Sequence, residues 1–332
     1  MLDEVTLPMF TSDRSTRLRL PTLGGVLVVG GLLLLEVVPA PAYALAVAGM
    51  GLVLALAGAL LTRTLRIELA WLRSRADSAD LTAVIGLYLA VVAGLWLAFG
   101  TFTTDNVLGL FLSFGSTLVV GVAGPVFYTV WVRRRPLASL GLTLGDWRAT
   151  AALALVFAGV QFSLTLARVQ YPAPEAWLPL LAMALPVGLF EAVFFRGFIQ
   201  NRLEASFGLI PAVAGAASLY GLYHIGYGMG LNEVAFLAGL GIVYAVAFRL
   251  AGSILVLWPL LTPLGSLFNQ IQSSDIVLPM ESILGFADVM VLMLAAIWFA
   301  RRHERRSGAE QATGGHPRGK GIRAGLGIGP SR

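Results

Sequence analysis

The 332-residue sequence contains no cysteine and few charged side chains. Without cysteine the chain can form neither a disulfide nor a thiolate metal site. Charged residues make up 12% of the chain, about half the share usual in soluble domains, whereas 57% of the residues are apolar. So little charge over the whole length predicts a membrane protein with several spans rather than a large soluble core.

Long apolar runs follow one another along the chain, and each is close to the roughly 20 residues that a helix needs to cross a bilayer. The first run follows a basic flank and resembles a secretory signal peptide, but the next run starts at once, which favours an uncleaved span. We therefore predict an all-α fold, a polytopic transmembrane helical bundle of about ten spans. The predicted spans are 22–39, 41–62, 81–101, 106–131, 149–168, 178–205, 209–228, 231–250, 253–273 and 277–300.

The net charge of +5 comes from arginines in short clusters between the apolar runs. This distribution is typical of the positive-inside bias of membrane proteins and not of a basic nucleic-acid-binding domain, so we expect no nucleic-acid partner. Nearly all clusters fall on one side of a ten-span bundle, which predicts cytoplasmic termini. The expected location is the plasma membrane of a prokaryote, as a multi-pass integral protein surrounded by membrane lipids.

Polar side chains within the spans are concentrated in the second half of the chain, which suggests four segments. Residues 1–21 form an N-terminal cytoplasmic segment, and 22–131 an accessory bundle of four spans. Residues 132–300 form the domain that carries the buried charges. The tail 301–332 is basic and rich in glycine, so we expect it to be disordered.

Two ionisable side chains are predicted to face each other inside the membrane. Glu191 lies 15 residues before Ser206, and His224 lies 16 residues after Gly208. If the chain turns between Ser206 and Gly208, both lie about 23 Å from the turn on antiparallel helices. Buried ionisable groups are expensive in a membrane and are functional candidates by default. A carboxylate and an imidazole at one depth can act as a general base and its partner.

A third polar side chain is predicted at the same depth. Asn269 lies 17 residues after a turn near Gly252, or about 25 Å along a helix. It shares a helical face with Thr262, Ser266 and Ser273. Such a polar stripe can supply a hydrogen-bond donor to an oxyanion, or it can serve plain helix packing.

Three further residues are assigned orienting roles. Arg196 follows Glu191 by five residues, which places it some 140° around an α-helix, so that pairing within the helix would be awkward. Asp288 is predicted at a similar depth, and a cross-helix ion pair with Arg196 is one interpretation. Tyr220 shares a helical face with His224. One His and one Glu fall short of the usual three protein ligands of a metal, so we expect neither metal nor cofactor.

These residues lie in motifs of a known family. Residues 191–196, EAVFFR, resemble the E-E-x-x-x-R motif of the CPBP intramembrane proteases, which include CAAX proteases and bacteriocin-processing enzymes. Residues 220–224 resemble the F-x-x-x-H motif of this family, and 265–269 is the best counterpart of its H-x-x-x-N motif. The resemblance covers roughly 135–272. Ala192 replaces the second Glu of the first motif, and Tyr220 replaces the Phe of the second motif. Gly265 stands where the third motif has the second His of the family.

The resemblance implies a metal-independent intramembrane endopeptidase in which Glu191 activates water. His224 and Asn269 would then position the water and stabilise the oxyanion. The substrate would be a peptide or protein, either a prenylated C-terminus or a peptide leader. The replaced Glu and His keep an alternative open, a catalytically impaired family member that acts as a membrane binding or scaffold protein.

Overall fold

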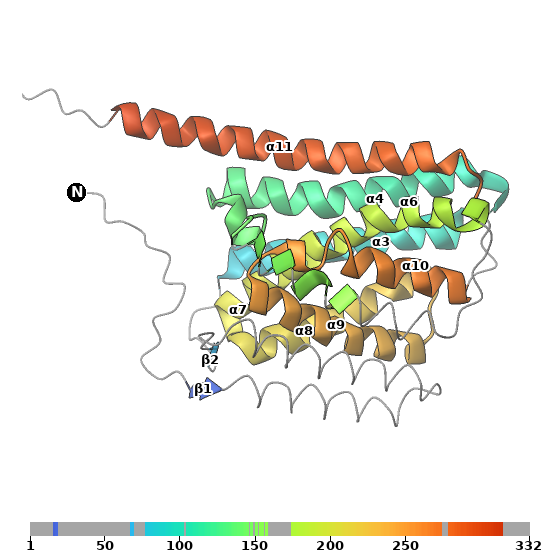
Figure 1. Ribbon diagram of the computed structural model, residues 1–332, viewed down its shortest axis with the longest axis horizontal. Helices are drawn as coiled ribbons and strands as arrows, with labels where there is room; N and C mark the ends of the chain where they lie inside the picture. The colour runs from blue at the N-terminus through green and yellow to red at the C-terminus, as the bar shows by residue number, and fades with distance from the viewer. Residues whose placement is uncertain are drawn as a thin grey trace, which may run out of the picture.

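The computed structural model describes residues 16–18, 67–69, 77–145 apart from 103, most of 147–158, 174–273 and 278–314. These residues are almost entirely helical, which confirms the predicted all-α class (Figure 1). The described residues also include connecting loops and a short antiparallel pair of strands, β1 (Thr16–Leu18) with β2 (Ile67–Leu69). The helices are α3 (Ser78–Thr101), η1 (Thr104–Asn106), α4 (Val107–Phe127), η2 (Tyr128–Val132), η3 (Leu137–Leu140), α6 (Pro174–Glu191), η4 (Ala192–Gln200), α7 (Asn201–Phe207), α8 (Leu209–Leu222), η5 (Tyr223–Tyr227), α9 (Leu231–Ala251), η6 (Ile254–Val256), α10 (Leu261–Ser273) and α11 (Ser282–Gly314).

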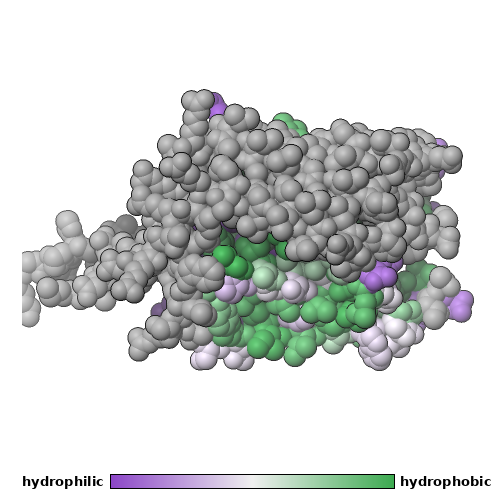
Figure 2. All heavy atoms as spheres, turned by 90° about the horizontal axis from the view of Figure 1, so that it is seen from below, coloured by the Kyte–Doolittle hydropathy of each residue, from purple (hydrophilic) through white to green (hydrophobic). Residues whose placement is uncertain are grey.

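Within the described residues, six helical stretches are long and apolar enough to cross a membrane, as an integral membrane protein requires. Their outer sides are apolar too: Leu89 and Trp96 on α3, Leu112 on α4 and Leu292 on α11 are all exposed. Figure 2 shows apolar residues over much of the coloured part of one face. The six stretches are Ser78–Thr101, Val107–Val132, Trp177–Phe207, Leu209–Tyr227, Leu231–Ala251 and Ser282–Ser307.

The predicted count of about ten spans is not confirmed. The predicted spans 22–39 and 41–62 lie outside the described residues, as does much of 149–168. The predicted span 253–273 is not one continuous helix, because it is divided into η6 and α10, and the 13 residues of α10 are too few to cross a bilayer. The tail predicted to be disordered from 301 onward instead continues α11 to its end at 314.

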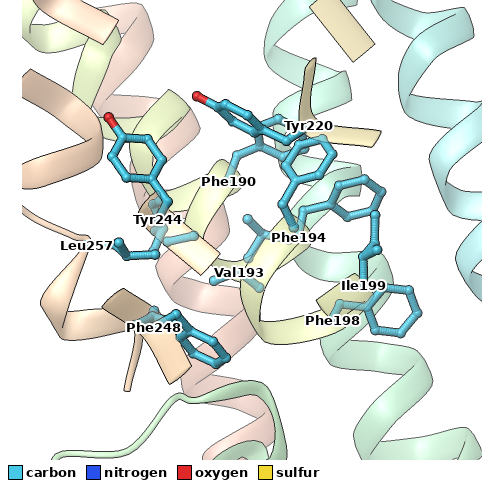
Figure 3. Packing of buried hydrophobic residues seen from close by; sticks show 14 of the residues in the cluster. Phe190, Val193, Phe194, Phe198, Ile199, Tyr220, Tyr244, Phe248 and Leu257 are labelled. Carbon is cyan, nitrogen blue, oxygen red and sulfur yellow. The ribbon is translucent and has the colours of Figure 1, made fainter. Parts of the chain in front are cut away.

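The core lies around the stretch formed by α6, η4 and α7. In the most apolar part of this stretch 78% of the residues are buried, whereas 22% are buried in the corresponding parts of α3 and α11. Phe190, Phe194 and Phe198 stack along it, with adjacent ring centres 5.5 and 6.4 Å apart (Figure 3). α4 approaches closely at Gly121, where an added Cβ would lie 2.2 Å from the Phe190 ring. The central stretch is therefore enclosed by the other helices, as a membrane-embedded site must be.

A buried ion-pair cluster fixes α3 to the end of the central stretch. Asp80 is only 3% exposed at its side chain and lies 2.7 Å from Arg135, 3.2 Å from Arg133 and 3.9 Å from Arg202. The Tyr128 hydroxyl also donates to Asp80 at 2.9 Å. Because one carboxylate faces three guanidinium groups, its charge holds together arginines that would otherwise repel one another.

Candidate active site

Glu191 ends α6, and its carboxyl group is held by two tyrosines. The Tyr223 hydroxyl donates to Oε1 at 2.5 Å, and the Tyr220 hydroxyl lies 3.3 Å from Oε2. Glu191 is 5% exposed, with Phe190 and Phe195 packed against the tyrosine rings. A carboxyl group in such surroundings depends on these hydroxyls, since burial without hydrogen bonds is costly.

Arg196 lies on the same side of the chain as Glu191, contrary to the 140° offset expected of an α-helix. The reason is η4, a π-helix that begins directly after Glu191. A π-helix bonds residue i to i+5, so residues five apart lie about one turn apart. The Arg196 guanidinium packs over the Tyr220 ring, 5.1 Å from its centre. Both side chains of the motif therefore contact Tyr220.

The guanidinium group of Arg196 is buried, with Arg196 only 1% exposed. Neither Nη1 nor Nη2 has a hydrogen-bond partner within the described part of the chain. A cation–π contact offsets part of this desolvation, but charged donors that are buried without partners remain costly. The group is thus a source of positive charge and of N–H donors beside Tyr220.

His224 lies in the 3-10 helix η5 and is 6% exposed. Its Nδ1 is 2.9 Å from the Tyr220 carbonyl oxygen. A carbonyl only accepts, so Nδ1 carries the proton and Nε2 is left as the acceptor in the neutral ring. The imidazole centre is 4.0 Å from the Tyr223 ring. The structure therefore brings Glu191 and His224 to the same pair of tyrosines.

Tyr223 is the site residue that the sequence reasoning missed, because no role was assigned to it. A signal was present: Tyr220, Tyr223 and Tyr227 are spaced at i, i+3 and i+7, which places them on one helical face. All three tyrosine rings surround His224, and the centre of the Tyr227 ring lies 5.7 Å from the centre of the imidazole. The backbone carbonyl of Tyr220 accepts a hydrogen bond from His224, and its hydroxyl donates one to Glu191.

Asn269 does not lie at the depth predicted for it. α10 runs antiparallel to α6: Thr262 at its start donates to the carbonyl of Gly188 at 3.1 Å, and Leu267 packs against Leu180. Two residues further on, the backbone at Asn269 is level with residues about ten positions before the end of α6, roughly 15 Å along the helix axis from Glu191. The side chain of Asn269 lies outside the described residues.

The prediction failed because the two turns used as references are not level. The turn at Gly252 is followed by Ile254, whose N–H donates to the carbonyl of Gly141 at 3.0 Å. The neighbouring η3 packs against η4 at Gly197, where an added Cβ would lie 2.3 Å from the carbonyl oxygen of Leu140. The turn at Gly252 therefore lies at the level of η4. The turn between α7 and α8 at Gly208 lies several residues further along the helix axis.

Asp288 is likewise not brought to the site. It lies on an exposed side of α11, whereas the Arg196 side chain is buried, and within the described residues no ion pair joins them. The described residues also contain no group of three or more His, Cys, Asp or Glu side chains placed to hold a metal ion.

Comparison with known proteins gives one family. Residues 173–260 match the family described as type II CAAX prenyl endopeptidase Rce1-like, which confirms the resemblance to the CPBP proteases over a segment shorter than half of the chain. The segment contains Glu191, Arg196, Tyr220 and His224 and ends before α10. No curated protein and no solved structure matches the chain.

Proposed function

We propose that this membrane protein is a metal-independent intramembrane endopeptidase of the CAAX-processing type, with Glu191 as the general base. The observation that supports it most directly is the pair of tyrosines shared by Glu191 and His224. Glu191 takes a proton from a water molecule, and the oxygen of that water attacks the carbonyl carbon of a peptide bond. His224 orients the water through the acceptor Nε2.

Arg196 is the group that we assign to the negative charge of the tetrahedral intermediate. Asn269 was expected to stabilise this charge but lies at another level of the bundle. The Arg196 guanidinium has unpaired N–H groups and contacts Tyr220, which also binds the base. Donors placed in advance toward a developing oxyanion typically contribute about 10²- to 10³-fold to the rate.

The proposed substrate is the C-terminal peptide of a prenylated, membrane-anchored protein. This assignment follows the matched family, whose description names prenyl CAAX endopeptidases. A lipid-anchored substrate also suits a site enclosed by apolar helices, because the anchor can reach the site through the bilayer. We further propose that both termini are cytoplasmic, from the positions of the arginine clusters.

A binding protein without catalysis is the second candidate, and one observation favours it. Both carboxyl oxygens of Glu191 already accept hydrogen bonds, and only 5% of this residue is exposed. A base in this state must exchange a tyrosine hydroxyl for water before it can act. The replacement of the second family Glu by Ala192 agrees with this candidate.

The test is hydrolysis of a fluorogenic peptide that ends in a farnesylated CAAX sequence, by the purified protein in lipid nanodiscs. Glu191→Gln should abolish cleavage because the amide cannot accept the proton. Glu175→Gln is the matched control, since Glu175 is exposed in the first turn of the same helix and should leave the rate unchanged. Cleavage that survives Glu191→Gln in folded protein would remove the proposed base and favour the binding protein.

A further inference from the structure

A cavity of about 410 Å³ lies where the C-terminal part of α11 passes η3 and the loop after it. One wall is apolar, and the other is a face of α11 that carries two arginines. In Figure 1, α11 extends past the end of α4 on this side of the bundle. The principal lining residues are Leu137, Leu142, Leu144, Arg301, Glu304 and Arg305.

The arginines of this cavity are poorly neutralised. Arg301 and Arg305 are four residues apart on α11, and like charges at that spacing repel each other. Among the described residues, Arg301 donates a hydrogen bond to the Leu142 carbonyl at 3.3 Å and forms no ion pair, and Arg305 forms neither a hydrogen bond nor an ion pair. The carboxylate of Glu304 accepts a hydrogen bond from the Leu137 N–H instead. The cavity therefore carries net positive charge and fits an anion.

The cavity also lies at the level expected for the membrane surface. The apolar part of α11, residues 282–300, is about 28 Å long, close to the roughly 30 Å thickness of a hydrocarbon core. Trp298, at the end of this part, is 52% exposed, and Trp131 nearby stacks on His303 with ring centres 5.3 Å apart. Exposed tryptophans gather at the boundary between lipid and water.

We propose that this cavity binds the headgroup phosphate of an anionic phospholipid. Arg301 and Arg305 contact the phosphate, and the exposed side chain of Leu144 contacts the glycerol and the upper acyl chains. A free phosphate would satisfy the arginines but would leave Leu144, which is 62% exposed, in water; Leu137 beside it is already buried. The combination of two arginines with an apolar wall thus favours the lipid as the source of the phosphate.

The test counts bound lipids on the purified full-length protein by native mass spectrometry. Protein in detergent is titrated with phosphatidylglycerol, with phosphatidylcholine and with inorganic phosphate. The double variant Arg301→Gln/Arg305→Gln removes both cavity charges. The double variant Arg302→Gln/Arg306→Gln is the matched control, because it removes two exposed charges from other faces of the same helix.

We expect saturable binding of phosphatidylglycerol with a preference over phosphatidylcholine, weakened about 10-fold or more in the cavity variant. The control variant should weaken binding by at most about 3-fold, through loss of general surface attraction. The single variant Arg305→Gln, which removes no hydrogen bond or ion pair between described residues, should show part of the loss. Equal weakening in both double variants, or no preference between the lipids, would overturn the proposal. Saturation by inorganic phosphate without binding of phosphatidylglycerol would also overturn it.

Discussion

Tyr223→Phe removes the hydroxyl that holds Oε1 of Glu191 at 2.5 Å and leaves the ring in place. The ring should keep its contacts with Phe195 and His224, whose ring centres lie 4.7 and 4.0 Å away. The substitution is therefore close to a deletion of one hydroxyl, which bonds Glu191 and also contacts the side chain of Tyr227. No cavity larger than a single oxygen atom is created, so the change in stability reports the hydrogen bonds of this hydroxyl together.

The expected loss of unfolding free energy is about 1–3 kcal/mol, because a buried acceptor loses its short donor and water has little access to replace it. Tyr220→Phe should cost less, about 0.5–1.5 kcal/mol, because its hydroxyl is 3.3 Å from Oε2. The Tyr220 ring, which contacts Arg196, is again preserved. The order of the two losses follows directly from the two distances.

The assay is unfolding in mixed micelles with increasing SDS, followed by far-UV circular dichroism. The measurement is repeated in a Glu191→Leu background, where neither hydroxyl has a carboxyl partner. Tyr223→Phe should then cost at least about 1 kcal/mol less than in the parent protein, the coupling typical of residues in direct contact. An equal cost in both backgrounds would show that the hydroxyl does not stabilise the protein through Glu191.

Three further predictions concern packing, charge and the corrected site. Gly197→Ala should destabilise the protein by about 1–3 kcal/mol in the same unfolding assay, because the new methyl group meets a backbone carbonyl of η3. The control Gly86→Ala should be neutral or stabilising, because no atom lies within 4 Å of the added methyl group. Asp80→Asn should cost about 3–5 kcal/mol, because it leaves the buried Arg202 without its counterion, whereas Arg133 and Arg135 keep Asp77. Exposed Asp288→Asn should stay within about 0.5 kcal/mol, and similar values for the two would contradict the ion-pair cluster. Asn269→Ala should change the rate of peptide cleavage by less than about 3-fold, and a loss of 10²-fold would show that this residue acts as an oxyanion donor after all.

The helical class could be predicted from the sequence, and so could the proximity of Glu191 and His224, which contact the same two tyrosines. Hydrophobic length gives the helices, and the hairpin turn falls where it was expected, with α7 ending at Phe207 and α8 beginning at Leu209. Counting residues from that turn therefore gave the right depths. Ten spans could not be tested, because part of the chain lies outside the described residues.

Two errors have physical causes that no composition rule reveals. Arg196 was placed on the wrong side because the extra width of a π-helix leaves no periodic signal in an apolar stretch such as 191–200. Asn269 was placed at the wrong depth because the level of the turn at Gly252 is set by a tertiary contact with Gly141. Residue counting assumes regular helices and level turns, and each assumption failed once.

The π-helix gives the site a sensitivity to chain length. All nine residues of η4 are buried, so an inserted residue cannot be absorbed at the surface. An insertion between Glu191 and Arg196 would turn the arginine away from Tyr220 by roughly 100°. A single deletion, by contrast, returns the segment to α-helical geometry, in which residues four apart lie about one turn apart, and keeps the arginine beside Tyr220. Natural variation in this segment should therefore include substitutions and single deletions but not insertions.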